Sequence, residues 1–317
     1  MPQYNATDAM FFGFRIFQRD PILVAVLSAL MAVFTLIAMQ LVWRDFAAFM
    51  VSMQAFTAAS QGQSTPEEAQ SVFGDLLASY GALLASPAML GYLALSLVVG
   101  AVMQAAILRH LVREERGGWV LGLQFGMDEV RVLVVGIAVG LILVLVTCLA
   151  FFLVMLLTGL SMIAHPALAV IVGLAAFIAA TLGVLLLGTR FCAAQAASIG
   201  ERKFVVLGSW AITKGRMWGL LGAFVVLFFI ALVAGLVVGL LAPLLAPQAS
   251  ELMQGTLEIG DVDNPGGAFL SPGYVLMTAL NAIVAVGATC AYAGVGAYAY
   301  RMAGVPSAGA PAVARTE

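Results

Sequence analysis

Charged side chains are scarce in this sequence. Asp, Glu, Lys and Arg make up 9% of the 317 residues, whereas 63% are hydrophobic, and the mean hydropathy is +1.07. Ordinary soluble domains carry about 25% charged residues, so this deficit excludes that class. The composition instead predicts a polytopic membrane protein.

Cysteine and histidine are also scarce. The three cysteines, Cys148, Cys192 and Cys290, form no CxxC pair, which argues against a disulfide framework or a zinc site. The two histidines, His110 and His165, fall on opposite sides of the predicted membrane. Because metal-assisted hydrolysis needs several carboxylates, usually with histidine, around one cation, we expect no catalytic residue, no metal and no cofactor. We therefore interpret the chain as a non-enzyme.

Ionisable residues are missing from the middle of the apolar segments. None of these segments holds Asp, Glu or Lys well inside it, and buried ionisable groups are the usual mark of proton relays and ion pathways. This argues against a proton-coupled pump or an ion exchanger. The sequence also lacks a GxSxG elbow, a P-loop and a dinucleotide-binding fingerprint.

Apolar runs of membrane-spanning length dominate what is present. A hydrocarbon core roughly 30 Å thick needs about 20 helical residues. Six segments qualify: residues 21–43, 87–112, 132–158, 166–188, 217–243 and 272–300. A capping side chain precedes a proline at Asp20-Pro21, Ser86-Pro87 and Ser271-Pro272, a favoured helix start, and His165-Pro166 is a weaker version. The fold class predicted is all-α, with six transmembrane helices arranged as three hairpins.

The domain organisation follows from these spans. We expect a single membrane domain over residues 1–303. The remaining stretch, 304–317, reads "GVPSAGAPAVARTE" and has the composition of a disordered cytoplasmic tail.

Basic residues alternate between the loops in a way that sets the topology. With a cytoplasmic N-terminus, Arg44 is the one basic residue on the outer side, where the loops are acidic. This pattern predicts a bacterial inner-membrane protein with both termini in the cytoplasm. Topology alone explains the inner cations; the sharper hypothesis is that they contact anionic lipids. The candidates for these contacts are Arg15, Arg19, Arg131, Arg190, Arg202, Lys203, Lys214 and Arg216. Nucleic-acid binding is not expected, because the charges are sparse and close to the membrane.

The stretch "SIGERKFVVLGSWAITKGRMW" interrupts the apolar pattern between the fourth and fifth spans. Ser198 and Glu201 have the spacing of a capping box, and Gly215 is placed as a C-terminal cap. At helical spacing, Phe204, Leu207, Gly208, Ala211 and Ile212 share one side, with Ser209 and Thr213 opposite. We therefore predict a short amphipathic helix that lies in the membrane interface.

Two similar elements precede other spans. "TDAMFFGFRIFQRDP" places Met10, Phe14 and Phe17 on one side, and "WVLGLQFGMDEVRV" groups Trp119, Leu123, Met127 and Val130 before ending at Arg131. The chain is thus expected to repeat one unit three times: an interfacial helix, a basic residue, a span out, a loop and a span back. Such repeats can place a ligand site at their interface.

The segment "ERKFVVLGSWAITKGRMWGLLG" resembles the recurrent motif of a bacterial family, the glycerophosphoryl diester phosphodiesterase membrane-domain-like proteins, and of related six-span inner-membrane proteins. The matching residues are Glu201, Ser209, Trp210, Thr213, Lys214, Gly215 and Trp218. "FGFRIFQRDP" looks like the family's N-terminal element, so the resemblance covers roughly residues 5–303. It implies a six-helix membrane fold, and the family has no agreed activity. The soluble catalytic barrel of true phosphodiesterases has no counterpart in this chain.

Small and polar residues mark two further surfaces. The last span carries Asn281, Ala285, Thr289, Ala293 and Ala297 at four-residue spacing. Asn281 and Thr289 are the candidate intramembrane polar or packing site. Internal packing is the plain interpretation of this face, residues 281–297, and a partner or substrate path is the alternative. GxxxG pairs at 136–140 and 235–239 predict close helix packing.

An amphipathic stretch in the first outer loop, residues 66–84, is a second candidate partner surface. It begins with a capping box at Thr65-Pro66-Glu67-Glu68 and continues with apolar residues at helical spacing. Its apolar side must pack on the protein's own helices, on the bilayer or on a partner.

These observations favour a non-catalytic inner-membrane protein. The expected roles are lipid handling, membrane organisation or support of a membrane partner, with membrane lipids as the expected ligands. The alternative is a small-solute or lipid transporter with a cavity between the repeats. In that case Asn281 and Arg190 would be the first residues to mutate.

Overall fold

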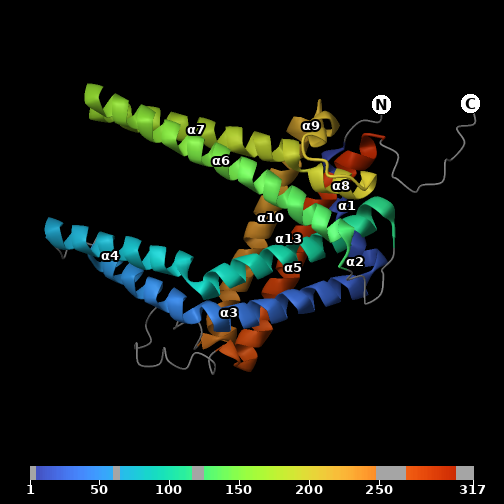
Figure 1. Ribbon diagram of the computed structural model, residues 1–317, viewed down its shortest axis with the longest axis horizontal. Helices are drawn as coiled ribbons and strands as arrows, with labels where there is room; N and C mark the ends of the chain where they lie inside the picture. Colours follow the sequence, from blue (N-terminus) through green and yellow to red (C-terminus); the bar gives the residue numbers. More distant parts are fainter. Residues whose placement is uncertain (1–4, 60–64, 116–124, 248–268, 305–317) are drawn as a thin grey trace, which may run out of the picture. The chain divides into compact units, whose positions relative to one another are not determined.

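A computed structural model describes residues 5–59, 65–115, 125–247 and 269–304. Within these ranges the chain is helical and contains no strand. Six helices are long and apolar enough to cross a membrane: α3 (Pro21–Ala58), α5 (Pro87–Arg113), α6 (Met127–Ala164), α7 (Pro166–Phe191), α10 (Met217–Leu245) and α13 (Pro272–Met302). The shorter helices are α1 (Ala6–Phe12), α2 (Arg15–Arg19), α4 (Pro66–Ala85), α8 (Ala194–Glu201) and α9 (Gly208–Thr213) (Figure 1). The predicted all-α membrane fold with six spans is confirmed.

The predicted helix starts are formed by side-chain caps. Three backbone N–H groups, of Leu23, Met89 and Tyr274, donate to Asp20 Oδ1 (3.2 Å), Ser86 Oγ (3.1 Å) and Ser271 Oγ (3.3 Å). The weaker cap also forms, since the N–H of Ala167 donates to Nδ1 of His165 at 3.1 Å. A proline follows each cap, as the Ncap-N1 preference requires.

Two helices run well beyond their predicted ends. α3 and α6 each have 38 residues, or about 57 Å at 1.5 Å per residue. α6 starts at Met127, so Arg131 lies in its early turns and does not end a separate interfacial helix. That part of the prediction is wrong, because Asp128 and Glu129 already occupy the first turn of the span. Residues 116–124, which held the rest of the predicted element, lie outside the described ranges.

The chain divides into two compact units. Unit 1 comprises Met1–Leu23, Gly100–Ile230 and Gly287–Glu317, and unit 2 comprises Val24–Val99 and Ala231–Val286. Helices α3, α5, α10 and α13 contribute residues to both units. The single domain expected over residues 1–303 stays a prediction.

Unit 1 is built on close approach between backbones. α6 and α7 run side by side as a long antiparallel hairpin (Figure 1), and α7 ends at a turn that leads into α8. The end of α13 that belongs to this unit contacts two chain bends: Gly294 touches Gly13, between α1 and α2, and Gly296 touches the carbonyl of Cys192. A Cβ at any of these three glycines would overlap backbone atoms. The predicted GxxxG glycines Gly140, Gly235 and Gly239 have no such neighbour within 4 Å.

Unit 2 is built on aromatic contacts. α4 packs along the C-terminal part of α3 through Phe49–Tyr80 (5.8 Å between ring centroids) and Phe56–Phe73 (5.9 Å). The predicted amphipathic helix in residues 66–84 is therefore present and packs on its own chain. Its Phe73, Leu77, Tyr80 and Leu84 still expose 41–54% of their surface, and a partner for this face stays a prediction.

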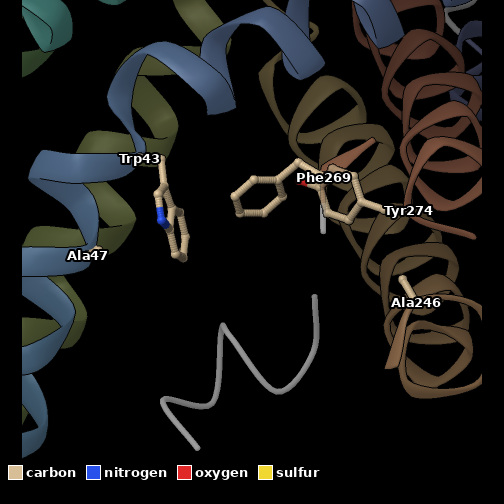
Figure 2. Close-up of a cluster of buried hydrophobic side chains, with 5 residues drawn as sticks. All are labelled: Trp43, Ala47, Ala246, Phe269 and Tyr274. Carbon is tan, nitrogen blue, oxygen red and sulfur yellow. The ribbon is translucent and has the colours of Figure 1, made fainter. Parts of the chain in front are cut away.

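A buried cluster closes the other side of unit 2. Figure 2 shows the indole of Trp43 facing the ring of Phe269, with Tyr274 beyond it. The centroid distances are 4.7 Å for Trp43–Phe269 and 5.0 Å for Phe269–Tyr274, both with edge-to-face geometry. Ala47 and Ala246 complete the cluster. Edge-to-face pairs at this spacing contribute beyond their buried area.

The basic residues of the described ranges gather in one unit. Arg44 belongs to unit 2, and every other described lysine and arginine belongs to unit 1. Arg15 and Arg202, which the six-span topology requires on the same side, lie in the same unit. Arg116 and Arg315 fall outside the described residues.

Candidate functional site

A cluster of buried ion pairs joins three elements of unit 1. Arg113, at the end of α5, donates to both oxygens of Asp128 in α6 (2.8 and 3.3 Å) and to the carbonyl of Ile199 in α8. The side chain of Arg113 is only 6% exposed. A guanidinium that forms a bidentate pair and also reaches a helix-end carbonyl fixes the relative position of all three elements. We use the name arginine cluster for Arg113 and Asp128 together with the two ion pairs described in the next paragraph.

Two neighbouring pairs complete the arginine cluster. Arg109 lies 2.7 Å from Glu129, whose side chain is 1% exposed, and Arg131 lies 2.6 Å from Asp128. Glu129 also accepts the backbone N–H of Gly126 at 2.8 Å and so caps the start of α6. These arginines lie in the early turns of α6 and the last turns of α5. Asp128 and Glu129 supply two negative charges for the three arginines of the arginine cluster, and the half-exposed Glu115 approaches Arg113 at 3.8 Å.

A more exposed pair follows α5. Glu114 accepts a hydrogen bond from Arg301 at 2.7 Å and has Arg19 at 3.9 Å. The hydrogen bond and charge of Arg301, together with the charges of Arg19 and His110, lower the pKa of Glu114 from its ordinary value. Glu114 adopts a left-handed backbone with φ of 57°, which ends α5 as glycine often does. This contact ties the end of α13 to the end of α5.

The segment after α7 is folded differently from its prediction. It forms two helices, α8 and α9, in place of one interfacial helix. Ser198 lies inside α8, is fully buried, and donates to the carbonyl of Ala194 while accepting the N–H of Val205. The predicted capping box at Ser198 and Glu201 is therefore wrong. Ser198 is used instead to hold the loop that follows α8.

The polar side of α9 faces the interior of the protein. Of the residues predicted on the apolar side, Leu207 is 73% exposed but Ile212 is buried, and Ser209 and Thr213, predicted on the opposite side, are 0% exposed. Their hydroxyls donate to the carbonyl of Arg190 at 2.6 and 3.5 Å. That carbonyl lies at the end of α7, where α-helical acceptors lose their partners. The polar side therefore turns inward to cap α7, and the apolar side is left for lipid.

Arg190 and Arg216 also have internal roles. The guanidinium of Arg190 lies 5.3 Å from the centre of the Trp210 ring, in cation–π geometry. Arg216 donates to the carbonyls of Ala299 (3.5 Å) and Met302 (3.1 Å) at the end of α13. A cation at a helix C-terminus is favourable because the carbonyls there carry partial negative charge. Gly215, just before it, has φ of 78°, but α9 ends at an extended Lys214 and not at a left-handed cap. Gly215 instead lies in the turn that the N–H of Arg216 closes on the carbonyl of Thr213 at 3.2 Å, so the predicted glycine cap is wrong.

One part of unit 1 presents cations and apolar side chains to the outside together. We name it the loop surface; its members are Arg202, Lys203, Phe204, Leu207, Trp210, Lys214 and Trp218. The four apolar members expose 53%, 73%, 47% and 72% of their area. Lys203 and Lys214 are exposed and have no carboxylate within 4 Å in the described part of the chain. Arg202 has one distant contact, at 3.9 Å, with Glu115.

The eight predicted lipid contacts therefore separate into two groups. Arg131, Arg190 and Arg216 are bound to groups of the protein itself. The exposed group consists of Arg15, Arg19, Arg202, Lys203 and Lys214. Within it, Arg15 lies over the ring of Phe12 and Arg19 is near Glu114. The loop surface contains the remaining three.

A hollow of about 380 Å³ lies within unit 1, beside α5, α6, α7 and α8. Its walls include Gln104, Gly136, Gly140, Gly188, Gln195 and Tyr292. The side-chain amide of Gln104 donates to that of Gln195, which in turn donates to the carbonyl of Val132 at 3.4 Å. We call this the glutamine hollow. The sequence analysis missed both glutamines, although an amide inside an apolar helix was the signal that singled out Asn281.

Unit 2 contains a second hollow of about 510 Å³, lined by Met31, Thr35, Gly239, Tyr274 and Asn281 among others. Asn281 is exposed on α13 and lines this hollow, and its role as an intramembrane polar site stays a prediction. Thr289 lies two turns further along α13, in unit 1. The structure therefore places the two members of the predicted pair in different units. On the same row, Ala293 and Ala297 are buried against the chain itself.

Searches of protein-family models, curated proteins and solved structures found no match to this chain.

Proposed function

We propose that this multi-pass membrane protein is non-catalytic and binds anionic phospholipids at the loop surface, in lipid handling or membrane organisation. The observation that supports this is the pairing of exposed apolar side chains with unmatched cations. Trp210 and Trp218 are exposed, as are Lys203 and Lys214 of the same stretch of chain. Tryptophan favours the membrane–water interface, and each cation near an anionic surface contributes about 1 kcal/mol.

The rest of unit 1 supports this surface. Ser198, Ser209 and Thr213 fix α8 and α9 by hydrogen bonds to the backbone. The arginine cluster binds α8 to α5 and α6. A lipid-binding surface held in this way loses little conformational entropy when the headgroup binds.

The backbone conformation of Arg202 also supports a role for its charge at the membrane. Arg202 ends α8 in a left-handed conformation, with φ of 55°, which costs a non-glycine residue about 1–2 kcal/mol. Glycine would avoid this cost. An arginine at this position is therefore understandable if its charge is used at the membrane.

The location proposed is a bacterial inner membrane, with the loop surface and both termini on the cytoplasmic side. The asymmetry of basic residues supports this, since unit 1 holds all of the described lysines and arginines except Arg44. Membership of the phosphodiesterase membrane-domain-like family is part of the same proposal, supported by the motif around Ser209, Trp210 and Gly215.

Native mass spectrometry tests the lipid proposal. The purified protein is mixed with equal amounts of phosphatidylglycerol and phosphatidylcholine, and the bound lipids are counted. We expect the wild type to retain phosphatidylglycerol preferentially. In a variant carrying Lys203→Gln and Lys214→Gln, this preference should be at least about five-fold lower, because each of the two charges removed contributes about 1 kcal/mol.

Two further variants make the test specific. Arg44→Gln removes a cation from unit 2 and should leave the preference unchanged. Arg202→Gly removes a charge and relieves the left-handed strain, so it should lower the preference without lowering the melting temperature. If the double lysine variant keeps the wild-type preference, the loop surface is not the lipid site.

Transport of a small solute or lipid is the second candidate. The observation in its favour is the pair of hollows lined by Gln104, Gln195 and Asn281. Uptake of a labelled lipid into vesicles that contain the purified protein would test it. Equal uptake with and without the protein would exclude this function.

A further inference from the structure

The glutamine hollow is lined by two amide side chains and by apolar residues of α6. Gln195 reaches the carbonyl of Val132, and Val132 directly follows Arg131 of the arginine cluster. The wall of the hollow continues along α6 through Gly136 and Gly140 to Leu143. The stretch from Gly136 to Leu143 is about 10 Å long at 1.5 Å per residue. One end of the hollow is therefore near charged groups and the other is apolar.

Space for a ligand is available at two glycines. A Cβ added to Gly140 or Gly188 would meet nothing within 4 Å, so neither position is filled by a neighbouring helix. The volume of about 380 Å³ falls in the range of about 300–1,000 Å³ that is usual for small-molecule sites, which are mostly apolar with a few polar groups.

The two amides define what those polar groups can recognise. Gln104 donates one hydrogen to Gln195, and Gln195 donates one to Val132. The carbonyl oxygen of Gln104 accepts no hydrogen bond from the described residues, and each amide has a second N–H hydrogen. The pair thus offers both an acceptor and donors to a ligand in the hollow.

We propose that the glutamine hollow binds an acyl glycerolipid that has a free glycerol hydroxyl beside an ester, such as diacylglycerol or a lysophospholipid. The hydroxyl donates to the carbonyl oxygen of Gln104, an ester carbonyl accepts from the amides, and the acyl chain lies along Gly136, Gly140 and Leu143. This site requires no charge on the ligand. It is therefore independent of phospholipid binding at the loop surface.

Native mass spectrometry with three lipids tests the proposal. The probes are dioleoylglycerol and oleoyl-lysophosphatidylcholine, which have the hydroxyl, and dioleoylphosphatidylcholine, which has esters but no free hydroxyl. We expect one molecule of either hydroxyl lipid to bind and the third lipid to bind at least about five-fold more weakly, as expected for one lost hydrogen bond. If dioleoylglycerol binds and the lysolipid does not, the ligand of the hollow is a neutral diacylglycerol. Equal binding of all three lipids would overturn the proposal.

Matched glycine variants locate the site. Gly140→Leu fills the glutamine hollow, and Gly239→Leu fills the hollow of unit 2, where an added Cβ also meets nothing within 4 Å. We expect Gly140→Leu to abolish binding of dioleoylglycerol and Gly239→Leu to preserve it. The reverse result would contradict the proposal.

A measurement on the wild type guards against a variant that fails to fold. A diacylglycerol with a photoactivatable diazirine on its chain should crosslink to the peptide that contains residues 136–143. Crosslinks confined to unit 2 would contradict the proposal. The Lys203→Gln, Lys214→Gln variant should bind dioleoylglycerol as the wild type does, so failure of the loop surface and failure of this site give different results.

Discussion

The two ends of α13 are packed in different ways, although they belong to one continuous helix. In unit 1, from Ala291 to Tyr300, eight of ten residues are buried, and Gly294 and Gly296 touch the backbone of other segments. In unit 2 the helix also makes such an approach, at Gly273, where an added Cβ would overlap the carbonyl oxygen of Leu245. Beyond it, Tyr274, Thr278, Asn281 and Ala282 border a hollow. Both ends of α13 thus approach other backbone segments closely, but the unit 1 end is packed along its length and the unit 2 end borders open space.

The two units also differ in the kind of side-chain contact that they contain. Unit 1 contains every ion pair found among the described residues, and several of them are buried. In unit 2, Trp43, Phe269 and Tyr274 provide the contacts. We infer that unit 1 is specified largely by ion pairs and other directional bonds, whereas unit 2 depends more on aromatic packing. The five predictions below test this difference.

The largest effect is expected for Arg113→Met. It leaves Asp128 and the carbonyl of Ile199 without their buried partner, and breaking a buried ion pair costs about 3–5 kcal/mol. Chemical unfolding in detergent, followed by circular dichroism, should show this loss. The control is Arg301→Met, which removes an exposed partner of Glu114 and should cost about 1 kcal/mol or less; equal losses would contradict the account.

For unit 2 the largest effect is expected from Phe269→Ala. This change removes a ring that packs edge-to-face against Trp43 and Tyr274, and such truncations cost about 3 kcal/mol or more. In a background where Trp119, Trp210 and Trp218 are replaced by Phe, the emission of Trp43 should shift when the ring beside it is lost. A variant with wild-type stability and emission would show that the cluster does not hold unit 2 together.

The close fit of unit 1 predicts a contrast between two glycines of α13. Gly294→Ala places a methyl group against Gly13 and should cost about 1–3 kcal/mol. Gly287→Ala meets only the edge of Phe17, at 3.7 Å, and should be neutral or slightly stabilising because alanine favours the helix. The melting temperatures of the two variants measure this contrast. Similar values would show that the close contact between Gly294 and Gly13 does not restrict the side chain at position 294.

A smaller effect is expected where α9 caps α7. Ser209→Ala removes the 2.6 Å bond to the Arg190 carbonyl and should cost about 1 kcal/mol. Hydrogen exchange should increase locally, in α7 near Phe191 and in α9. Ser79→Ala is the matched control, since its hydroxyl bonds only within α4, and it should leave exchange in unit 1 unchanged.

The smallest effect is a dependence on pH. Because Arg301 lowers the pKa of Glu114, the ion pair contributes stability above the ordinary pKa, and this contribution is lost as the pH falls below about 4.5. Glu114 is half exposed, so the change should be small and should decrease in high salt. Comparing the melting temperatures of the wild type and Glu114→Gln between pH 3 and pH 7 measures it; identical profiles would show that the pair contributes nothing.

Much of the fold was predictable because its signals are local. Asp20, Ser86 and Ser271 cap helices as expected. The long apolar runs identify all six spans. Each of these features depends on residues within a few positions of one another.

The features that could not be predicted depend on distant contacts or on the surrounding solvent. Arg113 and Asp128 are 15 residues apart and Gln104 and Gln195 are 91 apart, so spacing gives no indication that they meet. The inward turn of Ser209 and Thr213 has a different cause. A helix surrounded by lipid gains nothing by burying its apolar side, and the free carbonyl of Arg190 decides which side turns inward.

The most direct test of the lipid proposal is electron paramagnetic resonance of spin-labelled lipids in bilayers that contain the protein. The measured quantity is the fraction of phosphatidylglycerol and of phosphatidylcholine whose motion the protein restricts. We predict a larger fraction for phosphatidylglycerol, reduced by salt and by the Lys203→Gln, Lys214→Gln variant but not by Arg44→Gln. Equal fractions for the two lipids around the wild-type protein would contradict the proposal.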